Sequence, residues 1–419
     1  MEKNSQGFPE GKMSPELRFK GFEGEWEKKK LGEICNFSKG RGYSKNDLRR
    51  KGIPIVLYGR LYTKYELCIN HVDTCVEPIK EALCSKGGEI IIPASGETAE
   101  DISIASVIMT PGIIIGGDLN VLYPCDAYSP FFALVISNGS THNELSQKAQ
   151  GKTIVHLHNS SIKCTSVVYP RSITEQTKIG NLFISIDRQF SLHQKKLEGL
   201  KRLKHSMLVK MFPKEGATIP EIRFKGFEGE WEKKRLEEFA NKILEKNILN
   251  EYSITLTNSA EFGIIDQRDY FDRNVSNVEN INGYYVVRQD DFVYNPRIST
   301  IAPVGPINRN KTGLVGVMSP LYFVFRTNEV DYTYLEYYFK GNCWHRYMFL
   351  NGNSGARSDR FSISDDVFMK ISIAMPKDII EQIKIGQYFQ SLDRLISLHE
   401  QKLNKLKNLK TSLLQKMFV

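Results

Sequence analysis

The sequence predicts an α+β protein of two tandem halves related by a pseudo-two-fold internal repeat. Each half has a mixed helix–strand domain and a long helix, and the two long helices are expected to pair as an antiparallel coiled coil. Three observations lead to this prediction. Two segments of the 419-residue chain each occur twice at nearly the same offset. One of them has helical periodicity, and the stretches between the repeats have the short apolar runs of β-strands.

The first repeated segment opens each half. Residues 16–33 read ELRFKGFEGEWEKKKLGE and residues 221–238 read EIRFKGFEGEWEKKRLEE, an offset of 205 that matches Trp26 with Trp231. A period of this length is far longer than that of any solenoid repeat. The repetition therefore indicates duplication of a whole domain rather than a stacked array.

The second repeated segment closes each half and predicts a long helix. Residues 175–212 begin EQTKIGNLFISIDRQFSLHQKKL, residues 381–418 begin EQIKIGQYFQSLDRLISLHEQKL, and both end in Lys-Met-Phe. Apolar residues recur at steps of three and four, which is the pattern of a coiled coil, and Thr174 is the expected N-cap of the first helix. A helix of this length spans about 55 Å and cannot bury its apolar stripe alone. The two copies are therefore expected to pack on each other.

These repeats divide the chain into five expected segments. They are a flexible tail at 1–13, a first mixed domain at 14–174, a central spacer helix at 175–212, a second mixed domain at 213–380 and a C-terminal spacer helix at 381–419.

The two middles, 35–169 and 240–375, share little sequence. Apolar alternation and Gly/Pro punctuation predict short strands in both. The expected strands are 53–58, 89–93, 102–109 and 133–137 in the first middle, and 284–288, 291–295, 314–318 and 321–326 in the second. An aromatic-rich helix is expected near 332–350, which makes each middle a compact α+β domain.

Polar and basic residues gather in the loops beside these predicted strands. Such side chains bond phosphates and base edges, although any one cluster would also suit a solvated loop. The candidates in the first middle are Lys39, Arg41, Tyr43, Lys45, Arg60, Tyr62, Ser95 and Thr98. Those in the second are Asn295, Arg297, Ser299, Arg309, Lys311, Arg357 and Arg360.

The formal net charge of +9 lies in the predicted helices rather than in these loops. Residues 175–212 have a net charge of +5 and residues 381–419 a net charge of +4. The basic helices fit a solvated face, a phosphate track or a dock for an acidic partner. The charge alone is therefore weak grounds for locating a nucleic-acid site.

Composition argues against several classes of protein. No apolar run approaches the ~20 residues that span a bilayer, and the polar N-terminus does not resemble a signal peptide, so a cytoplasmic protein is expected. The seven cysteines include no C-x-x-C pair, which predicts reduced thiols and no metal site. The P-loop, H-E-x-x-H and G-x-S-x-G motifs are missing, so the pattern favours a binding subunit over an enzyme.

The repeated motifs closely resemble those of the specificity (S, HsdS) subunits of bacterial type I restriction-modification enzymes. The similarity lies in the opening segments 18–26 and 223–231 and in the Glu-Gln-x-Lys-Ile-Gly helices at 175 and 381, and it covers nearly all of the chain after residue 13. In that family the middles are target-recognition domains, each reading one half of a split DNA sequence, and the paired helices set the spacing between half-sites.

The resemblance also implies partners and cofactors. Two modification subunits would dock on the helices and methylate adenine, and two restriction subunits would translocate and cut DNA. S-adenosylmethionine, ATP and Mg are expected on those partners, with no cofactor and no catalytic residue on this chain. The spacer residues expected in helix packing or partner docking are Phe183, Asp187, His193, Asp393 and His399.

Two other functions stay open at this point. One is a stand-alone methyltransferase or nuclease with an unfamiliar motif, which would act without partners. The other is a coiled-coil scaffold that does not bind DNA, which would show no salt-dependent DNA affinity. The missing motifs weigh against the first, and the duplicated loop-rich domains weigh against the second.

Overall fold

The computed structural model describes residues 13–79, 81–151, 154–214, 216–270, 281–354 and 359–419. They form two compact units that do not follow chain order. Unit 1 is Met1–Lys195 together with Gln401–Val419, and unit 2 is Lys196–Glu400. Each unit therefore contains one mixed domain, the beginning of one long helix and the end of the other.

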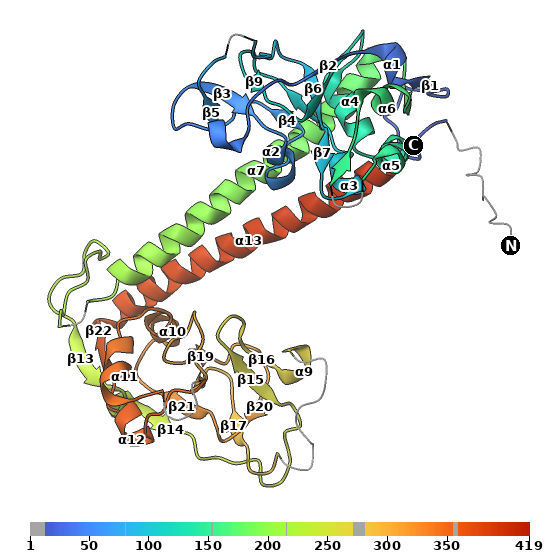
Figure 1. Cartoon of the computed structure of the whole chain (residues 1–419). Helices are drawn as coiled ribbons and strands as arrows, with labels where there is room; N and C mark the ends of the chain where they lie inside the picture. Colours follow the sequence, from blue (N-terminus) through green and yellow to red (C-terminus); the bar gives the residue numbers. More distant parts are fainter. Residues whose placement is uncertain (1–12, 80, 152–153, 215, 271–280, 355–358) are drawn as a thin grey trace. The chain divides into compact units, whose positions relative to one another are not determined.

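A mostly antiparallel sheet forms the centre of unit 1 (Figure 1). Its strands, in spatial order, are β2 (Cys35–Lys39), β10 (Leu119–Pro124), β6 (Glu89–Pro93), β8 (Ser106–Ile108) and β4 (Cys68–Ile69). Smaller sheets join β5 (Cys75–Val76), β3 (Ile53–Val56) and β9 (Ile114–Ile115), then β1 (Glu27–Lys30) and β12 (Ser166–Tyr169), then β7 (Ser95–Gly96) and β11 (Val155–His156). The short helices are α1 (Leu31–Ile34), η1 (Lys45–Asp47), α2 (Gly59–Thr63), α3 (Ala99–Ile102), α4 (Ser129–Ile136), α5 (Gly139–Lys148) and α6 (Asn159–Lys163).

Unit 2 repeats this framework with four central strands. They are β14 (Ala240–Lys242), β21 (Phe323–Thr327), β18 (Phe292–Tyr294) and β19 (Ile307–Arg309), in the spatial order of β2, β10, β6 and β8. Two-stranded sheets pair β13 (Glu232–Arg235) with β22 (Ser372–Met375), β15 (Leu256–Ser259) with β16 (Gly263–Asp266), and β17 (Tyr285–Val287) with β20 (Gly316–Met318). The short helices are α8 (Leu236–Phe239), α9 (Gln267–Tyr270), α10 (Tyr332–Lys340), α11 (His345–Asn351) and α12 (Asp365–Phe368).

The two long helices are α7 (Ile173–Lys210) and α13 (Ile379–Met417), and each lies within two residues of its predicted start and end. In unit 1 Asp187 of α7 forms an ion pair with Lys410 of α13, and in unit 2 Lys204 of α7 forms one with Asp393 of α13. The beginning of each helix thus lies beside the end of the other. The predicted antiparallel pairing is confirmed.

The repeated opening segment joins each mixed domain to its long helix. Arg18 donates from Nε and Nη2 to the carboxylate of Glu175, at 2.6 and 2.8 Å, and Arg223 makes the same two bonds to Glu381. Both glutamates are 1% exposed. The third nitrogen of each arginine, Nη1, donates to the carbonyl of a glycine with positive φ in the same loop. This glycine is Gly24 for Arg18 and Gly229 for Arg223. The repeated Arg and Glu are therefore one buried, two-pronged ion pair made twice.

The glutamine of each Glu-Gln motif ties its helix to the domain backbone. Gln176 accepts from the Tyr128 amide at 2.9 Å, just before α4, and donates to the Pro170 carbonyl at 2.8 Å. Gln382 makes the equivalent bonds to the Asp331 amide, just before α10, and the Pro376 carbonyl. Both glutamines are buried, so each bond satisfies a polar group that has lost its water.

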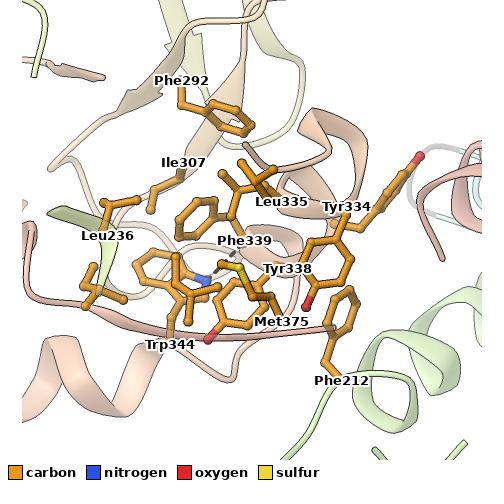
Figure 2. Packing of buried hydrophobic residues seen from close by; sticks show 14 of the residues in the cluster. Phe212, Leu236, Phe292, Ile307, Tyr334, Leu335, Tyr338, Phe339, Trp344 and Met375 are labelled. Carbon is orange, nitrogen blue, oxygen red and sulfur yellow. Dashed lines mark hydrogen bonds between the residues drawn. The ribbon is translucent and has the colours of Figure 1, made fainter. Parts of the chain in front are cut away.

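The phenylalanine of each terminal Lys-Met-Phe enters a hydrophobic core. Phe418 lies 6.0 Å from Phe131 and 5.8 Å from Phe183, ring centre to ring centre, inside unit 1. Phe212 stacks on Phe389 and lies 5.6 Å from Tyr334 inside unit 2, beside the aromatic side chains drawn in Figure 2. The end of each long helix therefore completes the core of the unit that contains the beginning of the other helix.

Four details of the predicted elements are wrong. The strand expected over 102–109 begins only at Ser106, because Ile102 ends α3. Residues 133–136 belong to α4, with Ser137 as its C-cap, rather than to a strand, because a short apolar run does not distinguish a buried helix from a buried strand. The helix expected near 332–350 is two helices, α10 and α11, separated at Gly341. The amide of Glu175 bonds to the hydroxyl of Ser172, so Ser172 rather than Thr174 caps α7.

No helix in the described residues has the length and apolar character needed to cross a membrane.

Candidate nucleic-acid interface

The first candidate loop follows β2 and is closely packed at its base. Lys39, Arg41 and Lys45 are exposed, and among the described residues their one ion-pair contact is 4.0 Å from Arg41 to Glu81. Tyr43 has a positive φ of 55°, and its hydroxyl donates to the Glu77 carbonyl and accepts from the Ile79 amide. Tyr43 therefore supports the loop, while the three cations project from it.

A second group of candidates meets at the end of β6. The Tyr62 hydroxyl donates to the Ser95 carbonyl at 2.7 Å, and burial raises the pKa of Tyr62 well above its ordinary value. The Ser95 hydroxyl lies 3.1 Å from Nδ1 of His156 on β11. Thr98 caps α3 by accepting from the Asp101 amide. The sequence pattern did not identify His156, because its partnership with Ser95 spans 61 positions.

The candidates of unit 2 gather after β18. Asn295 donates to the Asn258 carbonyl and accepts from the Arg297 amide, which fixes the start of the loop. Arg297 is exposed and its backbone bridges to that of Arg360. Ser299 closes a tight turn by accepting from the Ala302 amide. Arg357 lies outside the described residues.

Two of the predicted arginines lie in acidic pockets of the protein. Arg60 is held by Glu66 at 2.6 Å and Asp73 at 2.9 Å, and Arg309 by Glu336 at 2.9 Å and Asp290 at 3.1 Å. Both side chains are only 9% exposed. Carboxylates of the protein already neutralise both arginines, so each arginine has a structural role beneath the loops.

Glu336 is the centre of a cationic cluster in unit 2. Its carboxylate, 3% exposed, also binds Lys311 at 2.5 Å and Lys340 at 2.8 Å. Burial alone would raise the pKa of Glu336, but Lys340 and Lys311 outweigh it and bring the pKa from 4.5 down to about 2. The folded state therefore prefers the ionised carboxylate more than the unfolded chain does.

This preference predicts a pH dependence. The stabilisation is fully present above pH 5 and is lost as the pH falls from about 4.5 to 2, a loss on the order of 2–3 kcal/mol in unit 2. Glu336→Gln should remove this part of the dependence of the unfolding free energy on pH, as followed by chemical denaturation between pH 6 and 2.5. Glu245→Gln breaks an exposed pair with Arg288 and is the matched control. If the unfolding free energy of Glu336→Gln fell with pH as steeply as that of the wild type, the attribution of this pH dependence to Glu336 would be wrong.

The spacer candidates all lie in packed positions. Phe183 is fully buried against Phe418, and His399 is 7% exposed. Asp187 pairs with Lys410, while Asp393 pairs with Lys204 and accepts from the Tyr337 hydroxyl at 2.7 Å. His193 is half-buried on α7. The two aspartates thus join α7 to α13, one in each unit. The described residues contain no group of three His, Cys, Asp or Glu placed to bind a metal ion.

Two stretches of the chain match one protein family. Residues 23–202 and 228–408 each match the type I restriction modification DNA specificity domain. The chain belongs to this family of DNA specificity subunits. The two matches correspond to the two halves found from the repeats, and the specificity subunit is a recognition component rather than an enzyme.

One solved structure shares the fold, and another is less similar. The S subunit of a type I restriction-modification system from M. genitalium has a TM-score of 0.58 at 15% identity, with 97% of this chain and 99% of that chain covered. The HsdS subunit from Thermoanaerobacter tengcongensis has a TM-score of 0.46 at 17% identity, over 94% of this chain and 96% of that one. A search of curated proteins found no match. The specificity subunit thus shares the fold of the M. genitalium S subunit, and its family is that of the type I restriction modification DNA specificity domain.

Proposed function

We propose that each unit reads one half of a bipartite DNA sequence and that α7 and α13 set the distance between the halves. The observation that carries this proposal is the shared framework with different loops. Both units have the same strand order and the same Arg–Glu and Gln–backbone contacts, yet different side chains follow β6 and β18. A common scaffold with divergent loops suits two recognition tasks of one kind.

The exposed loop cations are the proposed DNA contacts. In unit 1 they are Lys39, Arg41 and Lys45, and in unit 2 Arg297, beside which the half-buried Arg360 is also proposed; Arg60 and Arg309 support them from inside the fold. We also propose the five-segment division of the chain given by the repeats. Two modification subunits would bind along the helices and two restriction subunits would join them in the cytoplasm. The partners would supply S-adenosylmethionine, ATP and Mg.

Co-expression with a cognate modification subunit, followed by sequencing of methylated adenines, tests this function. We expect a split motif with an unread gap. Arg297→Ala should broaden one half of the motif only, because it removes about 1–3 kcal/mol of discrimination between bases. Lys370→Ala, an exposed lysine beyond α12, is the matched control and should leave the motif unchanged. A continuous motif, or methylation by this chain alone, would refute the proposal.

A further inference from the structure

The backbone register allows positions in the two units to be matched despite their divergent sequences. Cys35 lies two residues after the first opening segment and pairs with Pro124. Ala240 lies two residues after the second opening segment and pairs with Thr327. Leu122 lies two residues before Pro124 on β10 and pairs with Ile90 of β6. Phe325 likewise lies two residues before Thr327 on β21 and pairs with Phe292 of β18. Ile90 therefore corresponds to Phe292.

Five residues further along, this match pairs Ser95 with Arg297. A second set of backbone contacts agrees with it. The Leu157 amide donates to the Ala94 carbonyl at 3.0 Å, and the Phe361 amide donates to the Pro296 carbonyl at 2.7 Å. Next to these bonds, the backbone of Ser95 pairs with His156, and that of Arg297 pairs with Arg360. The pairs Ser95–His156 and Arg297–Arg360 therefore occupy the same place in the two units.

Buried asparagines hold this place rigid in both units. Asn120, 1% exposed, donates to the Leu157 carbonyl at 2.8 Å, directly beside His156. Asn258, also 1% exposed, donates to the Val293 carbonyl at 2.7 Å, and its own carbonyl accepts from Asn295. The side chains at this place thus differ between the two units, while buried asparagines hold the backbone beneath them in both, which is what sequence reading requires.

We propose that these matched positions read bases in the two half-sites and that His156 is a base-contacting residue of unit 1. The proposal rests on the proposed function. His156 is exposed, and its Nδ1 is occupied by the Ser95 hydroxyl, which orients the ring and leaves Nε2 for one hydrogen bond to a base edge. Arg297 and Arg360 each offer a guanidinium fork, which fits the two acceptors of guanine. Unit 2 therefore requires guanine at this place, while unit 1 reads its base through a single bond.

The test uses the full chain co-expressed with its modification subunit, and methylated adenines are sequenced. His156→Ala should broaden one base position in one half of the motif, with a fall of about 2- to 13-fold in preference there, as expected for the loss of one hydrogen bond. The other half and the gap should stay unchanged. His156→Arg should shift the same position toward guanine. Arg360→Ala should broaden only the opposite half.

The matched control is His71→Ala, which removes another exposed imidazole of unit 1 and should leave the motif intact. A split wild-type motif that His156→Ala and His156→Arg both leave unchanged would overturn this inference and leave the proposed function standing. The absence of a split motif in the wild type would overturn the proposed function itself. Broadening of the same half by His156→Ala and Arg360→Ala would overturn the matching of positions.

Discussion

Phe418→Ala is expected to lower the free energy of unfolding of unit 1 by about 3–5 kcal/mol and to leave unit 2 unchanged. Phe418 directly follows α13, most of which belongs to unit 2, but its ring packs with Phe131 and Phe183. Loss of a buried aromatic ring removes its transfer free energy and leaves a cavity. Native-state hydrogen exchange should show faster opening of β6 and β10 and no change in β18 and β21.

Phe212→Ala is the mirror experiment, because the Phe212 ring packs with Tyr334 and Phe389 in unit 2. It should destabilise unit 2 and spare unit 1. Leu409→Ala controls for a simple loss of helix surface, since Leu409 is 48% exposed on the last part of α13, which belongs to unit 1 like Phe418. If Phe418→Ala loosened unit 2 instead, the assignment of residues 401–419 to unit 1 would be wrong.

The elements most accurately predicted from the sequence are those that occur twice. The periodicity of residues 175–212 and 381–418 located both helices to within two residues, because apolar spacing is a local property. Arg18 and Glu175 both lie in repeated segments, but the repetition does not relate one to the other. Their ion pair joins residues 157 positions apart, and no local pattern reports such a contact.

The loops were harder to predict, because burial decides their roles. Arg60 and Arg297 have the same side chain and similar loop surroundings in sequence, yet Arg60 is enclosed by two carboxylates and Arg297 is exposed. Only the folded positions of Glu66 and Asp73 distinguish them. His156 was missed for a related reason, since its partner Ser95 is adjacent only through the pairing of β7 with β11.

The second large effect is expected from Arg18→Met, which should destabilise unit 1 by about 3–5 kcal/mol. The variant keeps the length and apolar stem of the side chain but leaves Glu175, 1% exposed, without its two hydrogen bonds. The hydrogen bond to Glu175 also raises the pKa of Arg18 above its ordinary value. Arg223→Met should do the same to unit 2 through Glu381. Urea denaturation monitored by hydrogen exchange in each unit would measure both.

Two further variants separate the charge from the geometry of this pair. Arg18→Lys retains a cation without the planar fork and should fall between wild type and Arg18→Met. The double variant Arg18→Met with Glu175→Gln removes the unmatched charge and should recover much of the loss, because the penalty comes mainly from a buried carboxylate without a partner. A cost below about 1 kcal/mol for Arg18→Met would instead indicate an ion pair that behaves as a solvated one. Stabilising the connection between each mixed domain and its long helix would then not explain why the Arg–Glu pair occurs twice.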